Sequence, residues 1–228
     1  MTAMQVFRRR QRSDDARLPV QDIKPDVVII REHRAVVEFA RTLSTIFNPF
    51  LSATVLFVIV ARAFSTSVRQ FWELSFAGLL FFAVAPVLCI FYLYLSGRIS
   101  DFDMSDRMER RRAMLAFVVT YLAAAAFLGW VHAPKQLIAV TWGYVGAAAA
   151  IMVITRWWKI STHAFGITGP FAALFLLFNL QPLPYVIVVP LVWWARIYLR
   201  SHTFAQVFAG AAVAVISTWL FFRLFHLA

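Results

Sequence analysis

Residues 159–163 place a cation, two hydroxyls and an imidazole side by side, directly before a run of apolar residues. They read Lys159-Ile160-Ser161-Thr162-His163. An apolar run of this kind predicts a helix, so the group stands at a helix N-terminus. Free backbone N–H groups and the positive end of the helix dipole favour an anion there. A lone histidine at a helix start is usually structural, but these neighbours favour an anionic ligand.

A second polar group surrounds His202. Arg196 precedes it by six residues across a short break, and Gln206 follows it four residues later, on the same face of a predicted helix. Gly210, one turn further on, would let a neighbouring helix approach closely. Arginine binds phosphate through two parallel hydrogen bonds and stays charged when partly buried. This group therefore also fits a phosphorylated ligand.

The elements that must position both groups are transmembrane helices. Of 228 residues, 61% are hydrophobic and 14% are charged, against about 45–50% and about 25% in soluble domains. This composition, with one cysteine, excludes a disordered chain and a disulfide scaffold. Apolar runs long enough to cross a bilayer core of about 30 Å predict an all-α polytopic bundle of six or seven spans, at residues 44–63, 72–96, 113–132, 136–154, 164–180, 185–199 and 203–225.

The segment before the first span differs from the rest. Residues 1–43 carry nine basic and six acidic residues, and we expect them to form a cytoplasmic tail that precedes a transmembrane domain over residues 44–228. Apolar residues at helical spacing predict an amphipathic helix on the membrane surface over residues 27–42. Asn48-Pro49 predicts that the first span is broken or lies partly in the interface.

Seven spans would bring the tail and three loops to one face of the membrane, the loops being residues 98–112, 156–163 and 196–202. Of the 22 Lys and Arg residues, all but four belong to this face, the exceptions being Arg62, Arg69, Lys135 and Arg223. The positive-inside rule therefore predicts that this face is cytoplasmic, in an inner or plasma membrane. The net charge of +11 then follows loop topology, so we expect no binding of nucleic acid.

The two histidine groups resemble the second and third signature motifs of the type 2 phosphatidic acid phosphatase superfamily, membrane-bound lipid phosphatases related to vanadium haloperoxidases. The second motif of that family reads Pro-Ser-Gly-His, and Ser161 and His163 match it. The third reads Ser-Arg-x5-His-x3-Asp, and Arg196 and His202 have its spacing. The resemblance covers roughly residues 98–215.

The chain departs from these motifs at four positions. Ile160 and Thr162 replace the proline and glycine of the second motif, and Ala195 and Gln206 replace the serine and aspartate of the third. The carbonyl of Gln206 can still orient the His202 ring, but it does not stabilise an imidazolium as a carboxylate does. The resemblance therefore implies either a slower enzyme or an orienting carboxylate from Asp101, Asp103 or Asp106.

The first motif of the family, Lys-x6-Arg-Pro, has no faithful copy. Its counterpart in chain order and membrane face is the loop at residues 101–112, from which Arg107 and Arg110 correspond to phosphate ligands. The three aspartates of this loop could instead chelate Mg²⁺ around a diphosphate, as in an intramembrane prenyltransferase. Such enzymes use two Asp-rich loops, and a second one is missing, so pairing of the aspartates with neighbouring arginines is the stronger interpretation.

The resemblance implies an integral-membrane phosphatase that hydrolyses a lipid phosphate or diphosphate of the phosphatidate, phosphatidylglycerol phosphate or polyprenyl type, without a metal or cofactor. It implies that His202 attacks phosphorus to form a phosphohistidine, while His163 protonates the leaving oxygen and then activates water. Gln206 would orient His202. The phosphate oxygens would be held by Lys159, Ser161, Thr162, Arg196, Arg107 and Arg110.

A catalytically weakened scaffold or transport protein of the same fold is the main alternative, because Gln206 and the imperfect first motif could record lost catalysis. For the phosphatase, the expected partners are the lipid phosphate substrate and membrane lipids. The remaining histidines and Cys89, which lies in an apolar span, are expected to be structural.

Overall fold

A computed structural model describes residues 34–100 and 106–227, and within these ranges the regular structure is helical, without strands. The elements are α3 (Arg34–Ile46), α4 (Pro49–Phe64), α5 (Val68–Leu79), the π-helical turn η1 (Leu80–Val84), α6 (Ala85–Leu95), α7 (Arg107–Trp130), α8 (Lys135–Ile154), α9 (Thr162–Phe178), the 3₁₀ turn η2 (Leu183–Tyr185), α10 (Val188–Tyr198) and α11 (Phe204–Leu224). The predicted all-α class is confirmed for this part of the chain.

Four helical stretches are long and apolar enough to cross a membrane: Val68–Leu95, Arg107–Trp130, Lys135–Ile154 and Phe204–Leu224. The pair α3 and α4 would make a fifth span if it crosses as one bent element. Thr162–Phe178 and Leu183–Tyr198 are shorter apolar helices. The chain thus has the helices of a membrane protein, with four or five spans by length and composition.

Asn48 and Pro49 separate α3 from α4, and the two helices meet at an angle of 48°. The Asn48 carboxamide oxygen accepts hydrogen bonds from the N–H groups of Phe50 and Leu51, at 3.0 and 2.9 Å, so it caps α4. Pro49 occupies the first helical position, where its missing N–H costs nothing. The predicted break in the first span is confirmed.

The predicted surface helix over residues 27–42 lies partly outside the described residues. Its described part belongs to α3, which runs on to Ile46 and so crosses the predicted boundary between tail and transmembrane domain at residues 43 and 44. The chain from Phe39 onward forms one compact unit.

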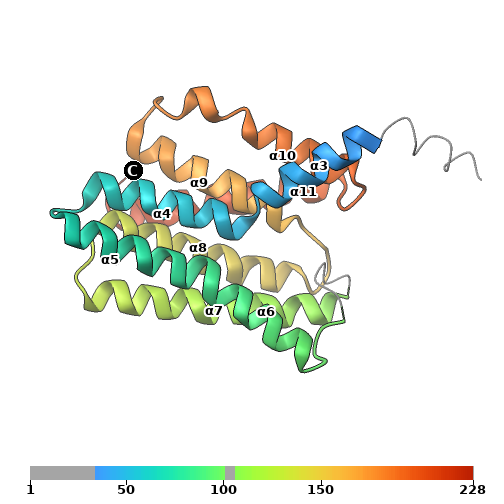
Figure 1. The fold of residues 1–228 in the computed structure, drawn as a ribbon, viewed down its shortest axis with the longest axis horizontal. Coiled ribbons are helices and arrows are strands. Elements are labelled where there is room, and N and C mark those ends of the chain that lie inside the picture. Colours follow the sequence, from blue (N-terminus) through green and yellow to red (C-terminus); the bar gives the residue numbers. More distant parts are fainter. Residues whose placement is uncertain (1–33, 101–105, 228) are drawn as a thin grey trace, which may run out of the picture. The chain divides into compact units, whose positions relative to one another are not determined.

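Within this unit, α11 packs against α8 and α9, and α7 packs against α8. The loop 155–161, the turn 199–203, the start of α7 and the α3–α4 junction lie at the same end of these helices (Figure 1). We call this end the polar end. It brings together the two segments that carry the histidine groups.

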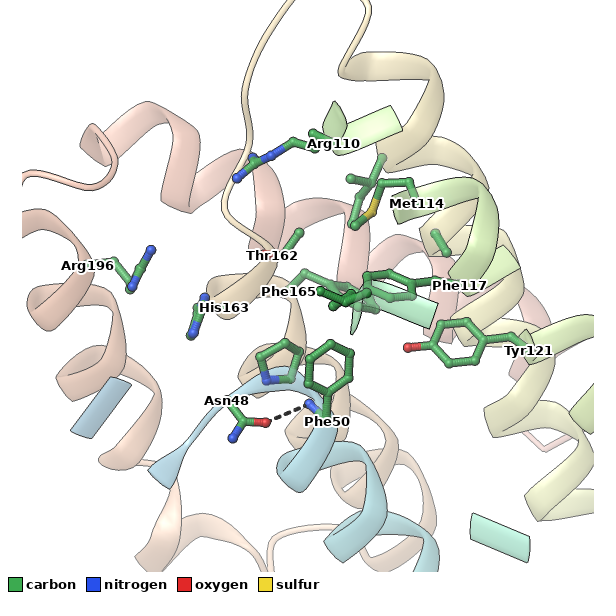
Figure 2. A pocket seen from close by; sticks show the side chains of 14 residues that line it. Asn48, Phe50, Arg110, Met114, Phe117, Tyr121, Thr162, His163, Phe165 and Arg196 are labelled. Atoms are coloured by element: carbon green, nitrogen blue, oxygen red, sulfur yellow. Dashed lines mark hydrogen bonds between the residues drawn. The ribbon is translucent and has the colours of Figure 1, made fainter. Parts of the chain in front are cut away.

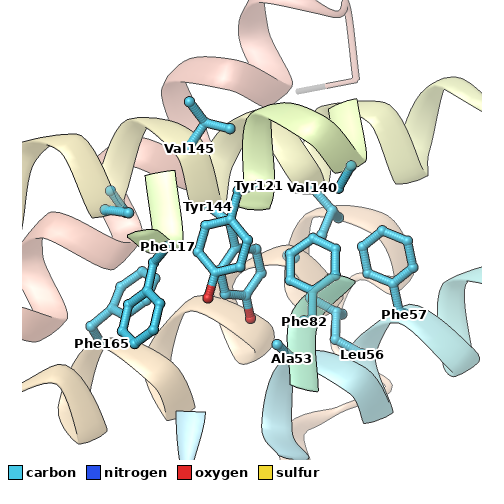
Figure 3. Close-up of a cluster of buried hydrophobic side chains, with 14 of the residues drawn as sticks. Ala53, Leu56, Phe57, Phe82, Phe117, Tyr121, Val140, Tyr144, Val145 and Phe165 are labelled. Atoms are coloured by element: carbon cyan, nitrogen blue, oxygen red, sulfur yellow. The ribbon is translucent and has the colours of Figure 1, made fainter. Parts of the chain in front are cut away.

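The middle of the unit contains a buried group of rings that we call the aromatic layer: Phe57, Phe82, Tyr121, Tyr144 and Phe165 (Figure 3). Phe82, like Tyr144, contacts three other rings of the layer. Its ring centroid lies 4.5 Å from that of Phe57, 5.0 Å from that of Tyr121 and 5.1 Å from that of Tyr144. The layer joins α4, η1, α7, α8 and α9 below the polar end.

The π-helical turn that carries Phe82 has a local cause. The N–H of Ala85 donates to the carbonyl of Leu80, five residues back, and Pro86 follows directly. A proline ring clashes with the carbonyl four residues before it, and a wider turn relieves that clash.

Candidate active site

Ser161 fixes the start of α9 at the polar end. Its hydroxyl accepts a hydrogen bond from the N–H of Ala164 at 3.3 Å, and its own N–H donates to the carbonyl of Gln206 at 3.0 Å. The side chain is completely buried. Because α9 begins here, Thr162 and His163 lie in its first turn, where backbone N–H groups favour an anion.

Two glycines let α9 approach its neighbours closely. A Cβ atom at Gly210 would clash with the carbonyl oxygen of Ser161, and one at Gly166 would clash with the ring of Pro49. The close approach predicted at Gly210 is therefore confirmed, and its partner is the cap of α9. The two contacts hold the first turn of α9 against both α11 and the start of α4.

A tight turn brings His202 back beside Arg196. Arg200 adopts a left-handed backbone conformation, with φ of 53°. The N–H groups of Ser201 and His202 both donate to the Arg196 carbonyl, at 3.1 and 3.3 Å. The His202 side chain is 6% exposed, so the turn places a buried imidazole next to the C-terminal end of α10.

Gln206 has two roles in the structure. Its side-chain oxygen lies 3.3 Å from Nδ1 of His202, as the four-residue spacing predicts. The same oxygen accepts a hydrogen bond from the N–H of Thr203 at 3.0 Å, and the Thr203 hydroxyl accepts from the N–H of Gln206 at 3.4 Å. This reciprocal pair is a capping box at the start of α11, so Gln206 both begins the helix and orients the histidine.

Two arginines from different helices approach His163 (Figure 2). Arg110 on α7 is 5% exposed, and its Nη1 donates to the carbonyl of Ile160 at 3.0 Å. Arg196 on α10 donates from its Nη1 to the hydroxyl of Ser44 on α3 at 2.9 Å. Both guanidinium groups are thus held in place by residues beside the start of α9 or at the α3–α4 junction.

A cavity of about 160 Å³ lies between these groups. Arg110, Arg196, Thr162 and His163 line one end of it, and Asn48 also contributes. The other end is lined by rings and apolar side chains, among them Phe50, Met114, Phe117, Tyr121 and Phe165 (Figure 2). The cavity therefore offers a charged end beside the histidine and an apolar end above the aromatic layer.

Both site histidines are held in the neutral state. Burial, followed by the positive charges of Arg196 and Arg110, lowers the pKa of His202 to about 3. Burial and then Arg196 also lower the pKa of His163 to about 3, although a hydrogen bond to the backbone of Ser44 acts in the opposite direction. A bound phosphate would offset the arginine charges, so its arrival would raise both pKa values.

The structure places the remaining predicted residues differently. Lys159 is half-buried, and its charge contributes to the lowered pKa of His202. Arg107 is exposed in the first turn of α7 and does not line the cavity. Of the two arginines proposed from the first motif, Arg110 is therefore the one at the site.

Of the three aspartates in the loop at residues 101–112, the structure describes one. Asp106 caps α7: one of its carboxylate oxygens accepts from the N–H groups of Met108 and Glu109, at 2.7 and 3.1 Å. Asp101 and Asp103 lie outside the described residues. Among the residues that are described, no group of three His, Cys, Asp or Glu side chains has the arrangement of a metal site.

Sequence reasoning missed the contribution of the α3–α4 junction. The Ser44 hydroxyl accepts a hydrogen bond from Arg196, and a hydrogen bond to the Ser44 backbone raises the pKa of His163. Asn48 lines the cavity. Asn followed by Pro predicts a helix start, but only the tertiary structure shows that this start lies beside the histidines. Tyr121, at the apolar end, carried no signal in the sequence.

Comparison of the chain with protein-family models, with curated proteins and with solved structures finds no match. The likeness to the phosphatase superfamily rests on the residues of the two histidine motifs. The function of the site follows, as a proposal, from the chemistry of these residues and of the cavity between them.

Proposed function

We propose that the chain is an integral-membrane phosphatase that hydrolyses a lipid phosphate or diphosphate through a phosphohistidine. One observation carries the proposal: Arg110, Arg196 and the first turn of α9 converge on the end of the cavity beside His163. Two guanidinium groups and a helix N-terminus together are complementary to a phosphate group. His163 lines that end of the cavity, and His202, which does not line it, is close enough for its charge to lower the pKa of His163. The two neutral histidines would supply a nucleophile and an acid–base group.

The first step uses the orientation of His202. When Nδ1 carries the proton and donates it to the side-chain oxygen of Gln206, the lone pair lies on Nε2. Nε2 attacks phosphorus, the P–N bond forms and the P–O bond to the lipid breaks. His163, protonated after the phosphate has raised its pKa, gives its proton to the leaving oxygen. Arg110 and Arg196 stabilise the charge on the equatorial oxygens.

The second step regenerates the enzyme. His163 is now neutral and takes a proton from water, the water oxygen attacks phosphorus, and the P–N bond breaks. Inorganic phosphate leaves with the proton balance restored, because the proton that His163 lost in the first step returns in the second. The neutral side chain of Gln206 gives the intermediate imidazolium less support than a carboxylate would, so a modest rate is expected.

The substrate class follows from the cavity and the helices. A cavity of about 160 Å³ is smaller than the 300–1,000 Å³ or so of sites that enclose a whole ligand, so it matches a phosphate headgroup with the rest of the molecule outside. Phosphatidate, phosphatidylglycerol phosphate and polyprenyl phosphates or diphosphates meet this description. Arg110, Arg196 and Thr162 line the cavity and are the proposed phosphate ligands. Lys159 and Ser161 do not line it and would act from beside it, and no metal or cofactor takes part.

We further propose six or seven spans, with α9 and α10 as short spans and the active site and N-terminus on the cytoplasmic side of an inner or plasma membrane. Single cysteines at Ser105 and Pro134, in a Cys89→Ala background, test the sidedness. Cytoplasmic placement predicts that an impermeant thiol reagent applied from outside labels residue 134 and not residue 105. The reverse pattern would contradict the proposed orientation.

Phosphate release by the purified protein tests the activity. The substrates are the lipid phosphates named above, in excess EDTA, and the variants are His202→Asn and the matched His132→Asn at the exposed end of α7. We expect metal-independent, vanadate-sensitive release that His202→Asn lowers by about a thousandfold or more and that His132→Asn retains. A ³²P-labelled substrate quenched in base should leave label on wild-type protein.

The alternatives give different outcomes. Hydrolysis that requires Mg²⁺ and survives His202→Asn would contradict the phosphohistidine mechanism. No hydrolysis of any phosphorylated lipid by the folded protein would favour a scaffold or transport protein.

A further inference from the structure

We propose that the apolar groove between α4, α9 and η2 binds the hydrocarbon chain of the same phosphorylated lipid whose headgroup occupies the cavity at the polar end. The inference deepens the proposed function, and it rests on it only in taking a phosphorylated lipid as the ligand. The groove has a volume of about 490 Å³, within the range of sites that enclose a drug-sized ligand.

The groove is almost entirely hydrocarbon in character. Two of its lining side chains carry a polar group, Ser52 and Tyr185; the others are aliphatic, proline or phenylalanine. Leu51, Val55 and Ile59 line it and are exposed on α4, so the groove opens sideways. A lipid chain can therefore enter it from the bilayer without passing through water.

The groove continues the same helix faces that begin at the site. On α9, the lining residues Ile167, Pro170, Phe171 and Leu174 follow His163 by four, seven, eight and eleven residues, which is one face of a helix. On α4, the lining residues Leu51, Val55 and Ile59 repeat every four residues after the Asn48 cap. Ile46 and Phe47 line the groove directly before Asn48, which lines the headgroup cavity.

The distance along α9 from His163 to the far end of the groove fits one leaflet. The eleven residues from His163 to Leu174 rise about 16 Å at roughly 1.5 Å each, which is half of a hydrocarbon core of about 30 Å. A phosphate at the polar end would thus have its chain lying along α9 to the middle of the bilayer. The headgroup cavity is too small for that chain, and the groove beside it is not.

Photolabelling tests the groove independently of turnover. The probe is hexadecyl phosphonate, which is not hydrolysed, with a diazirine at the end of its chain, added to the purified full chain in detergent micelles. We expect the label on α4 and α9 residues that line the groove. Excess inorganic phosphate, and the variant Arg196→Gln, should each lower that labelling about tenfold, because the headgroup would no longer anchor the chain.

A matched pair of variants tests it by kinetics. Val55 lines the groove, whereas Val119 is similarly exposed on α7 and lines none of the cavities described here. Val55→Trp should lower the ratio of kcat/KM for hexadecyl phosphate over butyl phosphate by about tenfold, since the indole fills the groove that only the long chain needs. Val119→Trp should leave the ratio and the labelling unchanged.

The outcomes separate the two proposals. Label spread over all exposed helices, or groove label that phosphate and Arg196→Gln do not reduce, would mean that the hydrocarbon chain partitions onto apolar surface without its headgroup being bound, and would overturn the inference. Equal ratios for Val55→Trp and wild type would overturn it as well. Phosphate-sensitive groove labelling without hydrolysis of any substrate would support the groove and contradict the phosphatase.

Discussion

The polar end and the aromatic layer lie on the same helices, but different forces position their side chains. In the aromatic layer, Phe82 is held by ring contacts with Phe57, Tyr121 and Tyr144. At the polar end, helix caps, a left-handed turn and hydrogen bonds to backbone carbonyls hold the charged groups, as when Arg110 donates to Ile160. Packing therefore determines the side-chain positions in the aromatic layer, whereas hydrogen bonds determine them at the polar end.

This difference implies that substitutions in the two regions should change different properties of the protein. Phe57 and Phe82 are buried and line no part of the cavity, so a substitution of either ring is expected to change mainly the free energy of unfolding. At the polar end a displaced cap or carbonyl would move a charge or an imidazole by a fraction of an ångström. In the proposed phosphatase, such a shift would change catalysis more than stability. Variants that separate the two readouts test the comparison.

The largest effect is expected in the aromatic layer. Phe82→Ala removes a ring with no exposed surface and leaves a cavity, and because lipid is as apolar as the layer, lost packing is the main cost. We expect a loss of about 3 kcal/mol in the free energy of unfolding, measured by denaturation in mixed micelles. Phe76→Ala, 65% exposed on α5, is the control and should cost far less. Equal losses would show that the layer has no special weight.

A smaller loss of stability, with a larger loss of activity, is expected from Gly210→Ala. The new methyl group would clash with the Ser161 carbonyl, so α11 must move away from the cap of α9. We expect about 1–3 kcal/mol of destabilisation and a fall in kcat that exceeds it when both are expressed as free energies. Gly169→Ala on α9 is the matched control, because its Cβ would lie 3.7 Å from Ala214. If activity falls only in proportion to folded protein, the polar end is not special.

Gln206→Glu should raise activity and leave stability almost unchanged. Glutamate preserves the capping box with Thr203 and adds a carboxylate at Nδ1 of His202. A charge-assisted hydrogen bond is roughly twice as strong as a neutral one, so we expect the rate of phosphoenzyme formation to rise about tenfold. Rapid-quench measurement of the labelled intermediate checks it, with Gln206→Met as the control that removes both roles. A slower Glu variant would mean that the neutral amide is the better partner.

Much of the fold could be predicted from the apolar runs and from the helix-breaking residues between them. Span 113–132 ends near Trp130, and the expected break at Asn48-Pro49 became a capped bend. The number of transmembrane spans could not be predicted from the apolar runs in the same way, because α9 and α10 are shorter than a full span. Whether a short apolar helix crosses depends on its partners, which a single sequence does not display.

The site was predictable where its residues are neighbours in sequence. The spacing of His202 and Gln206 predicts their contact, and Ser161 stands where a helix cap is needed. Contacts over long separations were not predictable: Arg110 reaches Ile160 fifty residues away, and Arg196 reaches Ser44. These depend on how helices pack, so Arg107 and Arg110 could not be told apart from the sequence.

The smallest expected effect concerns acid stability and again separates the two regions. Because the pKa of His202 is lowered to about 3 in the folded chain from 6.5 in the unfolded one, the unfolded state binds an extra proton below pH 6.5. Stability is therefore retained above that pH and falls as the pH decreases. Removing the imidazole with His202→Gln should lessen the fall by about 1 kcal/mol between roughly pH 6.5 and 5.5.

Denaturation of wild type and His202→Gln at a series of pH values measures this difference. The curves of unfolding free energy against pH should run parallel above about pH 7.5, where His202 is neutral in both the folded and the unfolded chain. Below that pH the two curves should converge. Phe82→Ala should shift the whole curve downward without changing its slope, since no proton is involved. Parallel curves for His202→Gln at every pH would mean that the imidazole is as accessible to protons in the folded chain as in the unfolded one. The arginines would then not enclose it.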